Sequence, residues 1–351
     1  MGQTRRPGRA ALASPLTFAL SGFVALLPTA VLAQPAETIS KQIIVYVAGT
    51  AGGGIDLYAR FLARYLGKHI PGNPTVVVQD MPGAGGIRAA NFIAQAAPRD
   101  GTAIGTFPGG PLIEPLVGAR TVDYDMSKFN WIGAISRDVS VCFALAKTPF
   151  KTIEDARARE MVIAGTGAGS ETDTLPLVLN DTLGTKFKVI TGYLGSKETL
   201  LAMENGEVHG RCGMTYSSLR AAKPDWLRDK QVNILVQLGR QKSSDLPNVP
   251  LISDLLSKTE DKQLFDLLTV GTVVGRPFAL PPGAPSSLVT MLRRAFDATM
   301  VDPDFLAEGQ KTNSEISPST GEDVQRIIAA AYATPKPVVN RAKALLAPAA
   351  K

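Results

Sequence analysis

The chain has 351 residues, 45% of them hydrophobic and 19% charged, so it can bury the core of one large or two ordinary domains. Two cysteines exclude a disulfide-stapled miniprotein and a cysteine-rich zinc or iron–sulfur protein, and two distant histidines, His69 and His209, weaken most histidine-based chemistry. The net charge is +6, and three of the basic residues that contribute to it lie within the first nine positions. Residues 10–36 contain no charged side chain.

The basic start, the apolar stretch and the small residues near Val31 and Ala33 are typical of a signal peptide, cleaved after residue 33. An uncleaved membrane anchor is the alternative, but Pro15 and Pro28 interrupt the helix that it would need. Removing residues 1–33 takes away three arginines and no acid, so the charge falls from +6 to +3. This mild charge gives nucleic-acid binding no support, and we expect a soluble, exported protein.

Strands and helices are predicted to alternate along the rest of the chain. The apolar, β-branched residues 43–47 form a strand, a glycine turn at 51–54 follows, and Asp56 opens a helix with an apolar face. Residues 75–78 then form a parallel strand, which completes a β–α–β unit. Further strands are expected at 102–107, 131–135, 139–146, 161–164, 187–190, 208–212 and 232–238, and residues 286–347 are mostly helical. This alternation predicts an α/β fold with parallel sheets.

Three glycine turns, each between a strand and a helix, lie at residues 51–54, 82–86 and 165–170. Glycine lets a ligand approach the main chain closely, and the helix N-terminus adds free N–H donors and partial positive charge. The sequence therefore predicts an anion pocket framed by residues 52–56 and 167–170. The alternative is that such turns only allow tight packing, with Asp56 and Ser170 capping their own helices.

The sequence contains no motif that is typical of nucleotide binding or of hydrolytic catalysis. No turn has the spacing of a dinucleotide fold or a P-loop, and the chain lacks G-x-S-x-G and H-E-x-x-H. Glu171 and Asp173 do not face each other on a helix, so they are interpreted as residues that favour the helix dipole. We therefore expect neither an enzyme nor a metal or other cofactor.

The two cysteines, Cys142 and Cys212, fall on predicted strands. In an oxidising compartment they could form a disulfide that closes a loop of about 70 residues, which contributes roughly 4 kcal/mol in the chain-entropy model. Two buried free thiols are the alternative.

Several segments together resemble one family. Residues 51–60 resemble its P-G-G-x-x-D-x-x-A-R, residues 81–86 its x-P-G-A-G-G, and residues 100–102 its D-G-y-T turn. Residues 192–208 are similar to its Y-x-G…L…G-x-V-D stretch, and residues 275–285 to its G-x-P-x-x-P-x-G-x-P segment. The family is that of the Bug-type solute-binding receptors of tripartite tricarboxylate transporters. The similar segments occur in the same order over residues 43 to 346.

The resemblance implies a type II periplasmic binding fold, in which two Rossmann-like lobes joined by two crossing strands close on a small carboxylate. With crossings near 137–141 and near Gly239, the lobes are expected at 42–138 plus 240–351 and at 139–239. Carried over by position, the implied ligand-binding residues are Ala51, Gly52, Gly53, Gly54 and Asp56 in one lobe and Thr166, Gly167, Ala168, Gly169, Ser170 and Tyr193 in the other. The implied partner is a membrane permease, and we expect a monomer.

The chain departs from the family pattern at three places. Ala51 replaces the usual proline, and Glu171-Thr172 follows Ser170 where many members have S-x-H. Arg211 lies in an otherwise apolar strand, where it is either a partner for the far end of a dicarboxylate or one half of a structural ion pair. A receptor that feeds a signalling partner and an enzyme of the same lobed shape are the alternatives to an uptake receptor.

Overall fold

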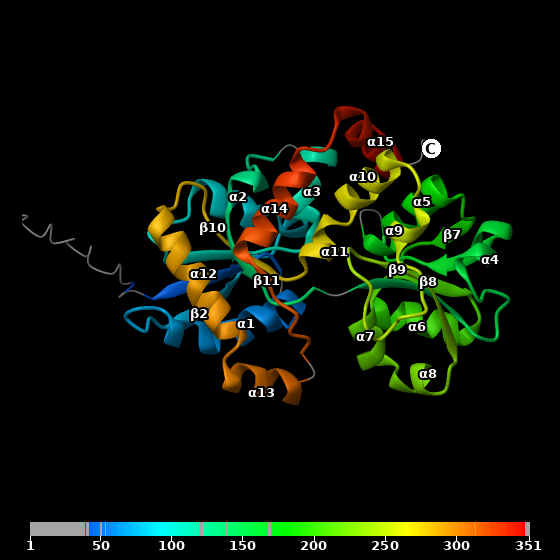
Figure 1. Cartoon of the computed structure of the whole chain (residues 1–351), viewed down its shortest axis with the longest axis horizontal. Helices are drawn as coiled ribbons and strands as arrows, with labels where there is room; N and C mark the ends of the chain where they lie inside the picture. Colours follow the sequence, from blue (N-terminus) through cyan, green and yellow to red (C-terminus); the bar gives the residue numbers. More distant parts are fainter. Residues whose placement is uncertain are drawn as a thin grey trace, which may run out of the picture. The chain divides into compact units, whose positions relative to one another are not determined.

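The computed structural model describes residues 39–347 except 40–41, 50, 53, 119–121, 138, 168–169 and 313. The signal peptide predicted at residues 1–33 lies outside these residues. The described chain forms two sheets with helices packed on their faces (Figure 1). We call each sheet with its helices a lobe.

The first sheet has the order β11-β4-β10-β3-β1-β2. Its strands are β1 (Ile43–Val47), β2 (Val76–Asp80), β3 (Ala103–Thr106), β4 (Asn130–Ala134), β10 (Pro277–Leu280) and β11 (Ser319–Thr320). β1 is parallel to β2 and β3, as the sequence predicted, whereas β10 and β11 are antiparallel to their neighbours. The sheet is therefore mixed, because β10 returns from the second lobe and enters from the opposite end.

The second sheet has the order β7-β6-β8-β5-β9. Its strands are β5 (Ser140–Leu145), β6 (Met161–Ala164), β7 (Phe187–Ile190), β8 (Gly210–Thr215) and β9 (Val232–Leu238). β6 is parallel to β7 and β8, but β5 is antiparallel to both β8 and β9. The prediction of purely parallel sheets is wrong here for the same reason, since β5 follows directly on the crossing from the first sheet.

Fifteen α-helices connect and cover these strands in the described part of the chain. They are α1 (Gly54–Leu66), α2 (Ile87–Gln95), α3 (Gly109–Val117), α4 (Ile153–Ala158), α5 (Glu171–Leu183), α6 (Ser196–Asn205), α7 (Tyr216–Ala222), α8 (Pro224–Arg228), α9 (Ile252–Leu255), α10 (Thr259–Leu268), α11 (Val270–Val274), α12 (Ser286–Met300), α13 (Pro303–Lys311), α14 (Gly321–Tyr332) and α15 (Lys336–Leu346). None of the helices in the described part of the chain is long and apolar enough to cross a membrane.

Three hydrophobic clusters hold the elements together. One packs α1 and α12 on the first sheet, and another packs α6, α7 and α8 on the second. The third combines residues of α2, α3 and α14 with residues of α5, α10 and α15, so it includes side chains from both lobes. Burying such apolar surface is the main force that stabilises the fold.

The chain passes between the sheets twice. The first passage joins β4 to β5, and Ile135 there donates its N–H to the carbonyl of Arg276 on the returning segment. After β9 the chain stays on the second sheet, where Gln237 Nε2 donates to the carbonyls of Leu246 and Val249. It then continues through α9, α10 and α11 to β10 of the first sheet.

The two passages lie against each other at Gly275. A Cβ atom on this glycine would lie 1.8 Å from the carbonyl oxygen of Ser136, and its φ of +73° is in the left-handed region. Only glycine fits here, because both the space and the backbone conformation exclude a side chain. This close contact fixes the position of Arg276, the next residue.

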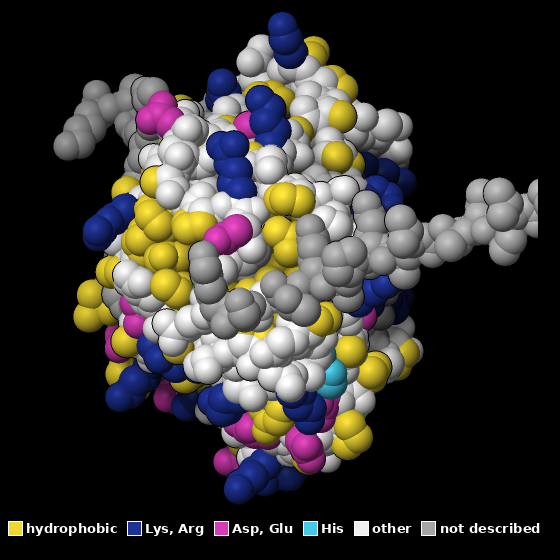
Figure 2. Space-filling model, turned by 90° about the vertical axis from the view of Figure 1, so that its left-hand side faces the viewer, with side chains coloured by type: hydrophobic (Ala, Val, Ile, Leu, Met, Phe, Trp, Pro, Cys, Tyr) yellow, Lys and Arg dark blue, Asp and Glu magenta, His cyan; other side chains and the backbone are white. Residues whose placement is uncertain are grey.

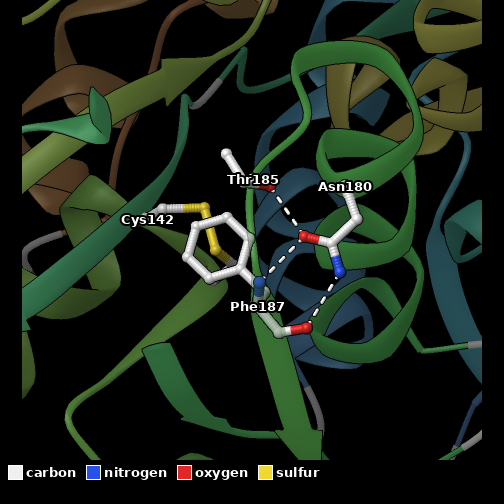
Figure 3. Close-up of a disulfide and its surroundings, with 5 residues drawn as sticks. Cys142, Asn180, Thr185 and Phe187 are labelled. Carbon is white, nitrogen blue, oxygen red and sulfur yellow. Dashed lines mark hydrogen bonds between the residues drawn. A yellow bond between two sulfur atoms is a disulfide. The ribbon is translucent and has the colours of Figure 1, made fainter. Parts of the chain in front are cut away.

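Cys142 of β5 and Cys212 of β8 are bonded in the structure, and both are fully buried. Figure 3 shows the disulfide beside the ring of Phe187 on β7. There Asn180 of α5 accepts hydrogen bonds from the N–H of Phe187 at 2.9 Å and the hydroxyl of Thr185 at 2.7 Å. Asn180 Nδ2 also donates to the carbonyl of Phe187 at 2.8 Å. The disulfide thus lies in the core between the sheet and α5.

Ion pairs link α1 and the 3-10 turn that follows it, Gly67–His69, to α13 and to Asp302, which caps α13. Lys68 and His69 both contact Asp302, at 2.5 and 2.7 Å, and Arg64 pairs with Glu308. Figure 2 shows acidic and basic side chains gathered at the lower end of one face, the end at which α13 lies in Figure 1. His69 is therefore engaged by the carboxylate of Asp302, the residue that caps the start of α13.

Candidate functional site

The first glycine turn connects β1 to α1 and is held by Asp56. One carboxylate oxygen accepts the N–H of Gly52 at 2.7 Å, and the other pairs with Arg60 Nε at 2.7 Å. Asp56 is 2% exposed, and Arg60 continues to Asp80 at 3.1 Å. Asp56 therefore shapes the turn from within, and the N–H of Gly52 is already taken. Ala51 and Gly54 lie on the same turn, and Gly53 falls outside the described residues.

The charge of Asp56 is stabilised by these contacts. Burial alone would raise its pKa, but the hydrogen bonds from Arg60 and from Gly52 N–H hold the pKa of Asp56 below its usual value. The pKa of Asp80 is raised, first by burial and then by the negative charge of Asp56. Of the two carboxylates that share Arg60, Asp56 is thus the one whose negative charge these contacts stabilise more strongly.

Replacing Asp56 by Asn should lower the free energy of unfolding by about 1–3 kcal/mol at pH 7, because a buried hydrogen-bonded charge is lost. A lowered pKa means that this stabilisation is present above the unfolded value near 3.9 and is lost as pH falls through the folded value. Urea unfolding of both proteins at pH 7 and near pH 3 measures this, and the difference should shrink at the lower pH. An equal difference at both values would contradict the role of the charge.

The second glycine turn connects β6 to α5 and has the same construction. Asp173 accepts the N–H of Gly167 at 3.2 Å, the hydroxyl of Ser170 at 3.2 Å and the hydroxyl of Thr191 at 2.5 Å. Thr172 Oγ1 accepts the N–H of Thr166 at 2.9 Å. Ala168 and Gly169 lie outside the described residues. Asp173, which the sequence indicated only as a helix-dipole residue, therefore fixes this turn as Asp56 fixes the first.

Two further side chains lie beside the turns, and the sequence analysis did not select them as site residues. Arg276 lies next to the first turn, since a Cβ atom on Gly54 would lie 3.6 Å from Arg276 Nη2. Glu171 begins α5 at the end of the second turn and accepts the hydroxyl of Thr272, which belongs to α11, at 2.5 Å. No local pattern indicates these positions, because the fold brings Gly54 and Arg276 together across more than two hundred residues.

Tyr193 and Arg211, the remaining predicted ligand residues, lie in the second lobe. Tyr193 donates its N–H to the carbonyl of Gly165 and its hydroxyl to Glu207 Oε2, both at 3.2 Å, so it adjoins the second turn. Arg211 is 4% exposed, and its Nη1 donates to Thr199 Oγ1 of α6 at 2.6 Å. No acidic side chain of the described residues forms an ion pair with Arg211.

A cavity of about 600 Å³ lies beside both passages between the lobes. Residues 137, 139 and 239–245 line it, together with side chains of α7, α11 and α14 and residues 315–317 and 319. None of the predicted ligand residues lines it, so this cavity is separate from the two glycine turns.

The described residues offer no constellation for metal chemistry. No group of three or more His, Cys, Asp or Glu among them is placed to hold a metal ion. His209 Nδ1 accepts the N–H of Val162 at 3.0 Å, so this ring supports the β6 edge. The arrangement at the turns instead offers main-chain donors, a cation and a carboxylate, which suit the binding of a small polar molecule.

Known proteins share both the sequence pattern and the fold. Residues 59–344 match the tripartite tricarboxylate transporter family receptor, TctC. A UPF0065 protein of Cupriavidus necator is 27% identical over 290 residues, which cover 78% of this chain and 79% of the relative. A TctC solute-binding protein from Polaromonas has a TM-score of 0.69 at 20% identity and covers 86% of this chain and 99% of its own.

A Rhodopseudomonas palustris protein with adipate has a TM-score of 0.61 at 20% identity, over 86% of this chain and 97% of its own. At such identities the likeness to solved structures shows the fold alone, and it confirms the predicted two-lobed type II periplasmic binding fold. The family match spans most of the chain. The chain therefore belongs to the receptor family of the tripartite tricarboxylate transporters, a family of solute-binding proteins.

Proposed function

We propose that this receptor binds a small organic carboxylate between its lobes in the periplasm and delivers it to a tripartite tricarboxylate-type membrane permease. The observation that carries the proposal is the matched pair of glycine turns, each of which leads into a helix N-terminus and is fixed by an aspartate. Free N–H groups at helix N-termini favour a bound anion. The adipate bound by a relative of the same fold is a molecule of this class.

The ligand contacts within this proposal are those expected from the sequence, with one refinement. The N–H groups of Gly52 and Gly167 already donate to Asp56 and Asp173. The expected donors for the ligand are thus other main-chain groups of the turns, such as that of Gly54 at the start of α1, while Gly53, Ala168 and Gly169, which the sequence also indicated, lie outside the described residues. Asp56 contributes by holding the turn, and Tyr193 by lining it.

A thermal-shift screen over mono-, di- and tricarboxylates tests the proposal. A ligand present at 100 times its Kd should add roughly 2.7 kcal/mol of stability and raise the unfolding temperature. Uncharged amides of the same acids provide the control, since they keep the size but lose the charge. If no carboxylate shifts the unfolding temperature more than its amide does, the proposal is wrong.

A further inference from the structure

The cavity beside the two passages is lined by more basic than acidic side chains. The basic ones are Arg137, Arg220, Arg240, Lys242 and Arg326, and the acidic ones are Asp245, Glu315 and Asp323. A hollow lined by an excess of one charge attracts ions of the opposite charge. The volume of about 600 Å³ lies within the range of small-molecule sites. The cavity therefore suits a small anion.

Two of the three acids are neutralised by cations of the same lining. Asp245 pairs with Arg220 at 2.8 Å, and Asp323 pairs with Arg326 at 2.5 Å. The third acid, Glu315, accepts a hydroxyl hydrogen bond at 3.2 Å. The positive charge that remains in the lining thus belongs to the other three cations, against this one carboxylate.

Arg137 and Arg240 are two of these remaining cations. Both are exposed, and neither forms an ion pair with an acid of the described residues. The charge of Arg240 acts on Asp266 of α10, but no contact at ion-pair distance joins the two. Both guanidinium groups therefore have N–H donors available for a bound molecule.

The backbone brings these two arginines to the same cavity. A Cβ atom on Gly239 would lie 2.7 Å from Val139 Cγ1, so the segment that continues to Arg240 packs directly on the first passage. On that passage the N–H of Arg137 donates to Ser317 Oγ at 2.8 Å, and Ser317 Oγ donates to the carbonyl of Arg137 at 3.1 Å. The main chain that carries Arg137 is thus already fixed, which reduces the entropy that binding would cost.

A buried hydroxyl without a partner also lines the cavity. Ser319 of β11 is 2% exposed, and its Oγ has no hydrogen-bond partner among the described residues. Leaving a buried hydroxyl unpaired costs stability, so such a group indicates a place where another molecule supplies the missing partner. This observation is independent of the charges and points to the same cavity.

We propose that this cavity is a second binding site, separate from the glycine turns, for a small molecule with at least two anionic oxygen groups. Arg137 and Arg240 bind these groups through charge-assisted hydrogen bonds, and Ser319 donates its hydroxyl to a further oxygen. Phosphate and carboxylate groups share this chemistry. None of the residues expected to bind ligand at the turns lines the cavity, so the inference does not depend on the proposed function.

Isothermal titration of the full mature chain with pyrophosphate and with citrate tests the site, in sodium chloride of matched ionic strength. The first probe represents phosphate compounds and the second represents carboxylates. The double variant Arg137→Gln with Arg240→Gln should weaken the binding of a probe in the cavity by at least about tenfold, because two charge-assisted contacts are lost.

The matched control is Arg157→Gln with Arg294→Gln, which removes one exposed arginine from each lobe. These two arginines do not line the cavity, and neither forms an ion pair within the described chain. The control loses the same charge as the double variant, and because salt screens distant charges it should change the affinity by less than about twofold.

Replacing Ser319 by Ala separates a ligand contact from a structural role. Because the hydroxyl has no partner in the described chain, its removal should leave the urea midpoint of unfolding unchanged or higher. The same variant should weaken the bound probe by about 2- to 10-fold, since one hydrogen bond is lost. A lower midpoint with unchanged affinity would contradict the contact from Ser319.

The two probes show which anions the site accepts. A loss of affinity in the double variant for pyrophosphate, for citrate or for both supports the site and assigns it to phosphates, to carboxylates or to either group. If neither probe binds, or if both bind equally well to the wild type and the double variant, the proposal is wrong. Binding that the double variant leaves unchanged would place the probe elsewhere, and the proposed function at the glycine turns would stand.

Discussion

Replacing both cysteines, as Cys142→Ala with Cys212→Ala, should lower the free energy of unfolding by about 4 kcal/mol. The disulfide closes a loop of 70 residues between β5 and β8, and its loss gives the unfolded chain more conformations. Both sulfurs lie in a core with no exposed surface, so shortening the side chains also leaves a small cavity. Urea unfolding of the oxidised protein and the variant measures the difference.

The reduced wild-type protein is the matched control for this variant. Unfolding and refolding in excess dithiothreitol should give a stability close to that of the double variant, since both lack the same cross-link. Because the bond is buried, we expect reduction of the native protein to be slow without denaturant. Equal stability of the oxidised and reduced wild-type proteins would contradict a stabilising cross-link.

Local pattern was enough to predict much of the fold. Residues 161–164, 187–190 and 232–238 are strands in the structure as in the prediction, because short apolar β-branched runs bounded by turns define them. The helix at α1 begins at Gly54, close to the expected Asp56. The formation of these elements depends on residues that are close together in the chain, and a single sequence contains that information.

The antiparallel strands and the helices from α9 to α11 were not predicted. The direction of β5 depends on which sheet edge the chain enters after crossing, and residues within the strand carry no signal for it. The return through α11 likewise depends on contacts with the other lobe. Leu246 and Leu251 both contact Gln237 of β9, a long-range contact that no local pattern indicates.

The sequence predicted the main-chain turns of the candidate site but only some of its side chains. Glycine turns are visible in sequence, so both turns were found. Arg276 lies at the variable position of the G-x-P segment, and the sequence indicated Glu171 as a helix-dipole residue and a departure from the family pattern. Their positions beside the turns come from contacts across the fold, to Gly54 and to Thr272.

Replacing Arg211 by Met should raise the free energy of unfolding by roughly 1–3 kcal/mol. Burial lowers the pKa of Arg211 to about 10, and no acid among the described residues compensates its charge. The lowered pKa shows that burial disfavours the charged form of this side chain. Met fills a similar volume without that cost, and Thr199 keeps its hydrogen bond to the carbonyl of Ser196.

Urea unfolding of Arg211→Met checks this, with Arg220→Met as the control. Arg220 is exposed and pairs with Asp245, so its replacement should change stability by less than about 0.5 kcal/mol. A loss of stability in Arg211→Met would show that its bond to Thr199 and its packing outweigh the burial of the charge. Of the two roles that the sequence left open for Arg211, the structural one would then remain. The described residues provide no acidic partner for it, so this role would not be that of an ion pair.

Titration of the same variant with ligand decides between the two roles of Arg211. A destabilising charge persists in a protein most readily where function requires it, as in many binding sites. If Arg211→Met is more stable and binds a dicarboxylate more weakly than the wild type, the arginine contacts the far end of the ligand. If it is more stable and binds equally well, Arg211 makes no contact with the ligand.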